Sequence, residues 1–208
     1  MKKNVFVISL IVCSYVVSFV AIPYLPNEVA IHWNAAGEAD GFANKWWGAL
    51  LFPLFLTGIV VLLAALPKLD PRKENYEKFQ GVYRLFLNVL VTFFFTLHLG
   101  TLAYNVGIPV QIDLFIPIGI GVLFIVLGNY LPKIKPNYFI GIRTPWTLEN
   151  ETVWQKTHRL GGKVFVIMGV LIMLTIFVES VWRFVLLIMI VFVGTIYMMI
   201  QSYVFSRK

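Results

Sequence analysis

The chain has 208 residues, of which 59% are hydrophobic and only 13% are charged, and its formal net charge is +7. Soluble domains are close to half apolar and a quarter charged, so this composition excludes an ordinary soluble protein and indicates an integral membrane protein. The positive charge does not require a nucleic-acid partner, because the distribution of Lys and Arg across a membrane explains it.

Six apolar runs follow one another along the chain, and a helix needs about 20 mainly apolar residues to cross a bilayer. The fifth run is short, but the last two together are too long for one helix, and Glu179–Arg183 divides them into a tight hairpin. We therefore predict an all-α, polytopic membrane protein with six transmembrane helices. The predicted spans are Val5–Ile22, Trp46–Leu66, Leu85–Tyr104, Leu114–Leu131, Val164–Val178 and Phe184–Phe205.

The first span can also be interpreted as a cleaved signal peptide, because Lys2 and Lys3 precede it. It lacks an Ala-x-Ala cleavage site, so an uncleaved helix is the better interpretation. Cys13, the single cysteine, lies inside this span, so the sequence offers no intramolecular disulfide and no cysteine cluster for a metal. We expect neither a cofactor nor a metal.

The basic residues predict the orientation of the helices, since loops rich in Lys and Arg stay in the cytoplasm. With a cytoplasmic N-terminus, fifteen of the 17 basic residues lie inside, and only Lys45 and Arg183 lie outside. Both termini are therefore predicted to be cytoplasmic. The inner basic residues are Lys2, Lys3, Lys68, Arg72, Lys73, Lys78, Arg84, Lys133, Lys135, Arg143, Lys156, Arg159, Lys163, Arg207 and Lys208.

This topology divides the chain into two regions of three helices each. Residues 1–105 hold the first three helices with an outer loop at 23–45, and residues 106–208 hold the last three with an inner loop at 132–163. The charged inner segment Pro67–Arg84 is expected to continue the third helix toward the cytoplasm.

Few polar residues lie within the predicted spans. His98, Thr101 and Asn105 share one face of the third helix because of their i, i+3, i+7 spacing. An ionisable residue at membrane depth is a candidate functional residue, but a neutral His98 that hydrogen-bonds a neighbouring helix is the simpler interpretation. No span has an Asp or Glu near its centre, which argues against a proton-coupled transporter. The glycines of the fourth span that allow close helix packing are Gly119, Gly121 and Gly128.

The outer loop is the only long segment on its side, so contact with an external ligand is expected there. Asp40-Gly41 is a turn signal within it. A metal site at His32, Glu38 and Asp40 is an alternative, but their spacing matches no established metal motif. The candidate recognition residues are His32, Trp33, Asn34, Gly37, Asp40 and Gly41.

The inner loop concentrates polar and aromatic residues between two apolar spans. Pro145 biases Thr144 toward an extended conformation, and Gly141 permits a tight turn. Asn150 is a good N-cap for a helix that runs through His158.

Two interpretations of this loop remain open. In the first, the helix after Asn150 lies in the membrane interface, with Val153, Trp154 and Leu160 toward the lipid and its basic residues at anionic headgroups. In the second, the loop forms a site for an anionic or peptide partner, since Arg binds carboxylates and phosphates in a bidentate manner. That site consists of Arg143, Trp146, Asn150, Trp154 and His158.

These residues together resemble the signature of the SdpI family, a family of bacterial polytopic membrane proteins. The outer Ile31-His32-Trp33-Asn34 and Asp40-Gly41 resemble an N-terminal domain of unknown function that is often joined to this family. The inner part of the resemblance consists of Gly128-Asn129-Tyr130, Gly141-Ile142-Arg143-Thr144-Pro145-Trp146-Thr147, and Glu151-Thr152-Val153-Trp154 with His158.

The resemblance implies a multi-pass protein of the bacterial cell membrane that gives immunity to a secreted peptide toxin. It also implies signal relay, in which the protein holds a cytoplasmic transcriptional repressor at the membrane without contacting nucleic acid itself. The inner-loop motif, Asn129 included, then serves signal output or acts as a structural clasp. Toxin recognition falls to the outer loop or to the helices.

The sequence contains no GxSxG, HExxH, Walker or dinucleotide-binding motif, so we do not expect an enzyme. A small transporter or membrane enzyme that acts on a lipid-linked or peptide substrate is the alternative, with the inner loop as its site.

Overall fold

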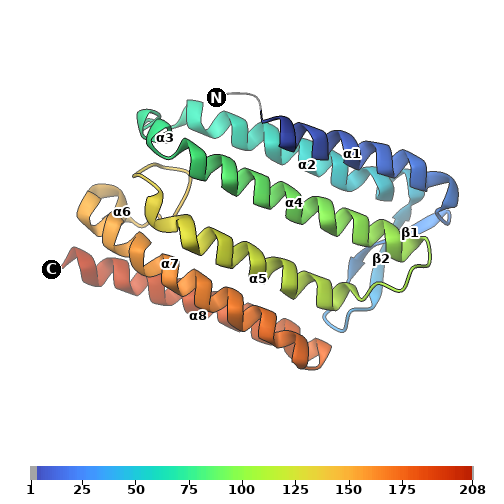
Figure 1. Cartoon of the computed structure of the whole chain (residues 1–208). Coiled ribbons are helices and arrows are strands. Elements are labelled where there is room, and N and C mark those ends of the chain that lie inside the picture. The colour runs from blue at the N-terminus through green and yellow to red at the C-terminus, as the bar shows by residue number, and fades with distance from the viewer. Residues whose placement is uncertain (1–3, 208) are drawn as a thin grey trace.

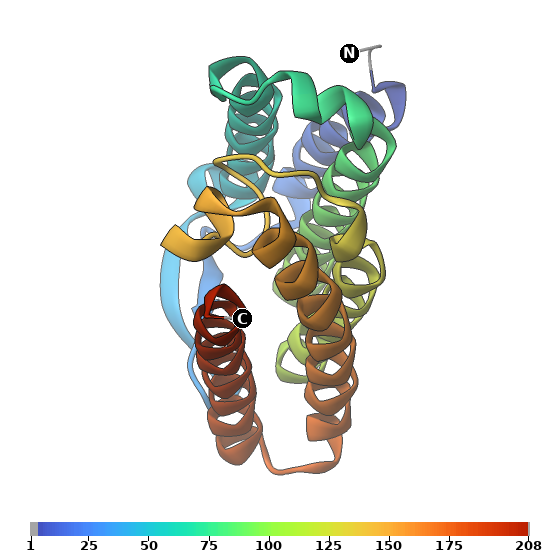
Figure 2. The ribbon, with the colours of Figure 1, turned by 90° about the vertical axis from the view of Figure 1, so that its left-hand side faces the viewer.

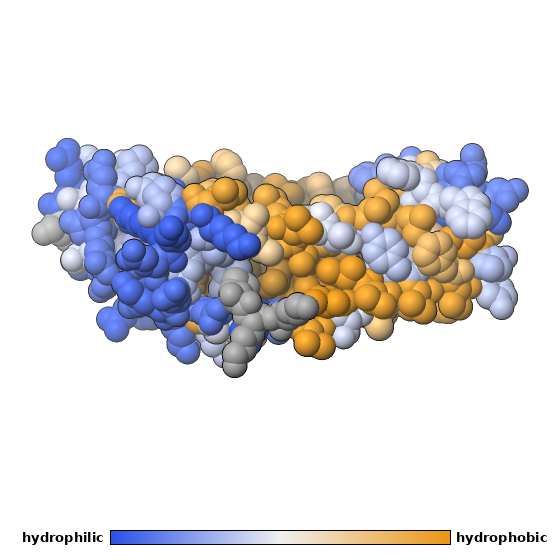
Figure 3. Space-filling model, turned by 90° about the horizontal axis from the view of Figure 1, so that it is seen from above, coloured by the Kyte–Doolittle hydropathy of each residue, from blue (hydrophilic) through white to orange (hydrophobic). Residues whose placement is uncertain are grey.

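A computed structural model describes residues 4–207 and consists mainly of long helices (Figure 1). Within these residues six helices are long and apolar enough to cross a membrane, as predicted. Figure 3 shows an apolar middle with hydrophilic residues gathered toward the ends, as expected of a multi-pass membrane protein. The six helices are α1 (Val5–Ala21), α2 (Lys45–Leu69), α4 (Gln80–Asn105), α5 (Ile112–Tyr130), α7 (Glu151–Leu174) and α8 (Ser180–Ser206).

Short elements join the long helices at two ends, which we name the hairpin end and the α6 end. Because the helices alternate in direction, α1 begins and α8 finishes at the α6 end. The basic residues predicted to be inner lie toward this end, except that Lys2, Lys3 and Lys208 lie outside the described residues. The hairpin end carries η1 (Ile22–Tyr24), β1 (Glu28–Trp33), β2 (Ala39–Asn44) and η3 (Thr175–Phe177), and the α6 end carries α3 (Glu74–Lys78), η2 (Leu131–Lys133) and α6 (Pro145–Glu149).

The fifth transmembrane helix is longer than the sequence predicted. The helix expected after Asn150 and the span expected from Val164 form one continuous helix, α7. Val153 and Trp154 are 3% and 1% exposed and pack inside the protein rather than against lipid. The interpretation of this segment as an interfacial helix is therefore wrong.

The connection between α7 and α8 and the one between α2 and α4 both differ in detail from the sequence predictions. The division of the last apolar stretch into two helices is confirmed, but the break lies earlier than Glu179–Arg183: η3 and an extended Val178 separate the helices, and α8 already begins at Ser180. The segment Pro67–Arg84 does not simply extend the third helix. It contains the end of α2, the short α3 and a backbone irregularity at Phe79, where φ is −130° and ψ is 23°.

The outer loop forms a two-stranded antiparallel sheet, an element that the all-α prediction did not include. The turn predicted at Asp40-Gly41 is wrong, because both residues lie within β2. The turn runs instead from Asn34 to Gly37, where the Gly37 N–H donates to the Asn34 carbonyl at 2.9 Å and Gly37 has a φ of +82°. The Asn34 side chain accepts from the Glu38 N–H at 3.0 Å, the local bonding that favours Asn in turns.

The helices form two groups of three (Figure 2). In the first, α1, α2 and α4 pack on one another; in the second, α7 packs between α5 and α8; and contacts between α4 and α5 join the groups. Val7, Leu56, Leu87 and Val91 form a buried apolar cluster in the first group. In lipid, such contacts stabilise a bundle through close packing rather than by removing apolar surface from water.

Helices α5 and α7 approach so closely that their backbones meet at two glycine pairs. A Cβ atom on Gly128 would lie 2.7 Å from the Gly162 carbonyl oxygen, and one on Gly162 would lie 2.7 Å from that of Gly128. Gly121 and Gly169 are related in the same way, at 2.7 and 2.6 Å. The close packing predicted for Gly121 and Gly128 is confirmed, and Gly119 permits a close approach to α4, where a Cβ atom would lie 2.6 Å from the Phe93 ring.

The polar face of α4 is used for contacts with its neighbours. His98 is fully buried, and its Nε2 lies 2.9 Å from the Ser18 hydroxyl of α1, so the predicted hydrogen bond to a neighbouring helix is confirmed. Asn105 reaches β1, where its Oδ1 accepts from the Ala30 N–H at 2.7 Å and its amide donates to the Ala30 carbonyl at 3.0 Å. These contacts fasten the hairpin to α4.

Gly128→Ala is expected to destabilise the protein by about 1–3 kcal/mol, because the added methyl group meets a backbone carbonyl that cannot move aside easily. The matched control is Gly58→Ala in α2, where a Cβ atom meets nothing within 4 Å. This control should be neutral or slightly stabilising, since Ala favours a helix by up to about 1 kcal/mol over Gly. Thermal unfolding of the purified variants in detergent measures both effects, and equal unfolding temperatures would contradict the proposed glycine contact.

Candidate functional site

The inner loop folds around the side chain of Asn137, which is fully buried. Its Oδ1 accepts from the backbone N–H groups of Phe139 and Ile140 at 3.0 and 2.7 Å. Its amide nitrogen donates to the carbonyls of Lys135 and Ile140 at 2.9 and 3.0 Å. One side chain thus satisfies four backbone contacts of a loop that has no regular structure here.

A second loop, between α2 and α4, joins this arrangement. The Tyr76 hydroxyl donates to Asp70 Oδ2 at 3.0 Å and also lies 3.2 Å from Asn137 Oδ1. The Tyr138 N–H donates to the same Asp70 oxygen at 2.8 Å. Burial, and then the hydrogen bond to the Asp70 carboxylate, raise the pKa of Tyr76 above its ordinary value, so the hydroxyl keeps its proton. We name Asp70, Tyr76, Asn137 and Tyr138 the clasp.

Two arginines reinforce the clasp from its surface. The Arg72 guanidinium donates to the Leu148 carbonyl at 2.8 Å and lies over the Tyr138 ring, 5.0 Å from its centroid. Arg143, which is exposed, donates to the Tyr138 carbonyl at 2.6 Å. Arg143 therefore has a backbone partner within its own loop rather than a place in a pocket.

The Thr-Pro-Trp-Thr part of the motif begins the short helix α6. Thr144 is extended as predicted, with a φ of −118° and a ψ of 162°, and Pro145 occupies the first helical turn. The Thr144 hydroxyl accepts from the Thr147 N–H, and the Thr147 hydroxyl accepts from the Thr144 N–H at 2.8 Å, a reciprocal capping box. Trp146 packs on Tyr203 of α8, with ring centroids 5.1 Å apart. These residues attach the loop to the last helix.

Trp154 and His158 are buried on α7, with their rings stacked at a centroid distance of 4.0 Å. The Trp154 indole donates to the Ile134 carbonyl at 2.9 Å. His158 Nε2 accepts from the Ile142 N–H at 3.1 Å, and its Nδ1–H donates to the Trp154 carbonyl at 2.9 Å. Both imidazole nitrogens are thus engaged in a neutral tautomer. Gly141 has a φ of +106°, and a Cβ atom there would collide with His158 Nε2.

The site predicted from Arg143, Trp146, Asn150, Trp154 and His158 does not assemble. Trp154 and His158 face the protein interior, Arg143 is exposed, and Trp146 lies against α8. Asn150 is the N-cap of α7, as predicted. Its side-chain oxygen accepts from the backbone N–H groups of Thr152 and Val153 at 2.8 and 3.1 Å. Asn129 is exposed on α5. The structure therefore favours a clasp over a ligand pocket for the loop itself.

The exposed face of the hairpin carries His32, Asp40 and Phe42. His32 Nδ1 lies 2.5 Å from Asp40 Oδ1, and Phe42 is 58% exposed. The third proposed metal ligand, Glu38, contacts Asn34 instead. Within residues 4–207 no group of three or more His, Cys, Asp or Glu side chains is placed to hold a metal ion.

Other recognition candidates hold the hairpin in place. Trp33 meets the Tyr104 ring edge-on at 5.3 Å, and a Cβ atom on Gly41 would lie 2.9 Å from His32 Cβ. Gly37, at the turn, approaches Asp113 so closely that a Cβ atom would lie 2.7 Å from Asp113 Cβ. The tip of the hairpin thus rests on the start of α5.

Asp113 also forms an ion pair that the sequence analysis missed. Arg183 Nη1 lies 2.5 Å from Asp113 Oδ2, and the guanidinium also donates to the Val178 carbonyl at 2.9 Å. Arg183 was counted only as an outer basic residue, although it is 8% exposed. An Asp directly before a predicted span and an Arg in a tight hairpin on the same side were the available signal.

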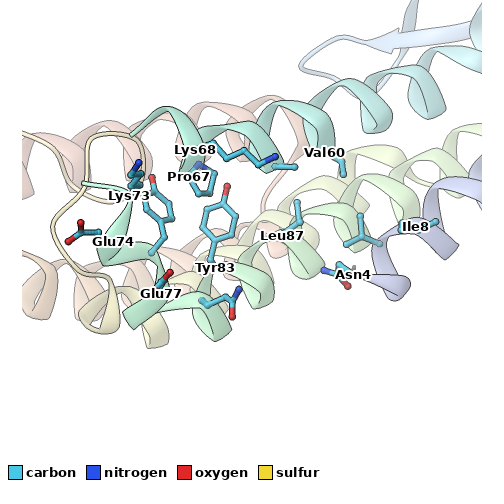
Figure 4. Close-up of a pocket in the computed structure, with 14 residues that line it drawn as sticks. Asn4, Ile8, Val60, Pro67, Lys68, Lys73, Glu74, Glu77, Tyr83 and Leu87 are labelled. Carbon is cyan, nitrogen blue, oxygen red and sulfur yellow. The ribbon is translucent and has the colours of Figure 1, made fainter. Parts of the chain in front are cut away.

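A cleft of about 730 Å³ opens at the α6 end, between the start of α1, the end of α2 and the start of α4. Figure 4 shows Lys68, Lys73, Glu74 and Glu77 around it, with the hydroxyl of Tyr83 directed toward α2. The Tyr83 hydroxyl donates to a carbonyl of α2. The cleft therefore offers charges of both signs beside the clasp.

Comparisons with known proteins fit this architecture. A family model described as the SdpI/YfhL protein family matches residues 133–202, and a domain of unknown function (DUF1648) matches residues 9–57. The immunity protein SdpI of Bacillus subtilis (strain 168) is 30% identical over 210 residues, which cover 100% of this chain and 98% of that protein. The chain belongs to the SdpI family. No solved structure matches it.

The SdpI match covers the loop side of the clasp together with α6, α7 and most of α8, and the other match covers most of α1, the hairpin and the first half of α2. Asp70 and Tyr76, which complete the clasp, lie outside both ranges. Sequence reasoning missed these two residues and Asn137. The one available signal was Asn137 after a proline in a loop, a position where Asn often bonds the backbone two residues on.

In this SdpI-family chain, Asn137→Ala is expected to cost about 3 kcal/mol of stability, because it leaves several buried polar groups without partners. Asn129→Ala, at an exposed position with a single side-chain hydrogen bond to the Ile125 carbonyl, is the control and should stay within about 0.5 kcal/mol of the parent. Thermal unfolding and limited proteolysis of the inner loop measure the difference. Equal behaviour of the two variants would show that the clasp does not stabilise the fold.

Proposed function

We propose that this protein is a bacterial cell-membrane immunity protein that protects against a secreted peptide toxin. The observation that carries the proposal is the full-length relationship to a protein named as an immunity protein, SdpI. The six apolar helices and the hairpin beyond them are compatible with protection at the membrane surface.

The proposed orientation has both termini in the cytoplasm. The basic residues support it, because among residues 4–207 those at the hairpin end are only Lys45 and Arg183, and Arg183 is neutralised by Asp113. The α6 end carries the remaining described Lys and Arg residues, a distribution typical of a cytoplasmic side. The hairpin then lies outside, where a secreted toxin arrives.

Toxin contact is assigned to the exposed face of the hairpin. His32, Asp40 and Phe42 combine a polar pair with an exposed aromatic ring, and aromatic side chains often dominate binding surfaces. The hairpin is held by Asn105 on one side and rests on Asp113 at its tip. A rigidly held surface loses less conformational entropy on binding.

Cells that lack their own immunity protein and express this chain should survive exposure to the cognate peptide, and Phe42→Ala should raise their sensitivity at least several-fold. Trp182→Ala is the matched control, because Trp182 is also an exposed aromatic residue at this end, 61% exposed, but lies on α8. Membrane levels of each variant are measured by immunoblot. If cells with and without this chain are equally sensitive to the peptide, the immunity function is refuted. If Phe42→Ala and Trp182→Ala change sensitivity equally, only the assignment of toxin contact to the hairpin is refuted.

We also propose that the α6 end relays a signal by holding a transcriptional repressor at the membrane. The support is the cleft beside the clasp, which carries Lys68, Lys73, Glu74 and Glu77 at its surface. Mixed charges at a surface favour specific protein recognition. The transporter or enzyme alternative has less support, because His158, its proposed site residue, has both nitrogens engaged.

The relay predicts that an ArsR-like regulator encoded near the gene moves to the membrane fraction when toxin and this protein are both present. Replacing Glu74 and Glu77 with Lys should reduce that fraction several-fold without loss of toxin protection. Glu151→Lys, an exposed charge reversal at the start of α7, is the control and should leave the fraction unchanged. A regulator that stays soluble with the parent protein would contradict the relay.

A further inference from the structure

A shallow groove of about 510 Å³ lies between α5 and α7, toward the α6 end. The glycine pair Gly128 and Gly162 forms part of its lining, because neither residue has a side chain to fill the space. Asn129 borders it on the α5 side, and Arg159 and Lys163 border it on the α7 side. The groove is separate from the clasp, the hairpin and the cleft described above.

The groove carries uncompensated positive charge. Arg159 and Lys163 are both exposed and one helical turn apart on α7. Within residues 4–207 neither side chain forms an ion pair or a hydrogen bond, and no carboxylate lines the groove. Arg183 at the other end, by contrast, is paired with Asp113. A pair of unneutralised cations on a membrane protein attracts an anion.

The groove lies at the depth of lipid headgroups. Helix α5 has 19 residues and is therefore about 28 Å long, close to the ~30 Å thickness of the hydrocarbon layer. Asn129 is the last residue but one of this helix, so it lies at the boundary of that layer. Below the two cations the groove continues over Val166 and Ile167, and Ile167 is 58% exposed on the lipid-facing side.

We propose that this groove binds an anionic phospholipid, with the headgroup phosphate between Arg159 and Lys163. The guanidinium offers two parallel N–H donors to phosphate oxygens, and the ammonium adds a point charge. Asn129 lines the same groove; its amide nitrogen bonds the Ile125 carbonyl, which leaves Oδ1 as an acceptor for headgroup hydroxyl groups. The first part of an acyl chain lies on Val166 and Ile167. A charged rim directly above an apolar wall is complementary to a lipid and not to a freely soluble anion.

The test uses the full chain, reconstituted in phosphatidylcholine vesicles with phosphatidylglycerol as a minor component. The protein is extracted in mild detergent, and the phosphatidylglycerol that stays bound is measured by native mass spectrometry. The parent protein should retain it. Each cation near a membrane surface changes affinity roughly five-fold, so replacing both Arg159 and Lys163 with Gln should reduce retention by roughly ten-fold or more.

Lys156→Gln is the matched control. Lys156 is exposed on the same helix two turns before Lys163, but it does not line the groove, so retention should be unchanged. If it lowers retention as much as the double replacement, the effect is general surface charge and the proposal is wrong. Equal retention by the parent and the double variant also overturns it. Displacement of the lipid by soluble glycerol phosphate would show a free-phosphate site instead. Because these variants lie outside the hairpin, toxin protection is scored separately.

Discussion

A carboxylate buried without a basic partner needs several hydrogen-bond donors, and Asp70 obtains them from both halves of the chain. It is 2% exposed and forms no ion pair within the described residues. The Arg72 N–H and the Tyr76 hydroxyl come from its own loop, while the Tyr138 N–H comes from a loop 68 residues away. Contacts between α4 and α5 join the two helix groups along the transmembrane helices. The Asp70 carboxylate joins them through the loops at the α6 end. The positions of α6, of the first turns of α7 and of the charged cleft follow from that connection.

The opposite end of the molecule is joined by a different interaction. Asp113 pairs with Arg183 of α8 and also supports Gly37 at the hairpin tip. The hairpin, from the first half of the chain, thus rests on α5, which is itself paired with α8. Because α4 contacts the hairpin through Asn105 at one end and α2 through Tyr83 at the other, it connects the two surfaces that the proposed function requires.

Hydropathy was sufficient to predict the six helices, because a membrane span is specified by local composition alone. The sequence analysis did not predict the hairpin, because its strands are short and partly polar. Two segments, Asn34–Gly37 and Asp40-Gly41, have residues that favour a turn, and only one of them forms it. The turn forms at Asn34 to Gly37 because Gly37 adopts a positive φ and the Asn34 side chain bonds the backbone of the turn. The motif around Arg143 indicated the protein family, but the residue pattern alone did not show whether the loop binds a ligand.

The burial of Trp154 and His158 argues against a ligand site in the inner loop, and this burial depends on contacts between segments that are distant in the sequence. Trp154 and His158 have the residue types of a binding site, yet the Trp154 indole and His158 Nε2 bond the backbone of the loop that covers them, and His158 Nδ1 bonds a carbonyl of α7 itself. No pattern within the inner loop predicts that Asp70 and Tyr76 will meet Asn137. Local chemistry was therefore predicted well at Asn150 and Thr144, and long-range pairing was not.

The side chain of Asn105 pairs with both the N–H and the carbonyl of Ala30, as a neighbouring strand would. A single amide thus occupies the outward edge of β1 at that residue. Within the described residues the sheet has only two strands, so the outer edge of β2 has no strand partner. An extended peptide that lengthens this sheet has one edge to pair with, and Phe42 lies on that strand beside it.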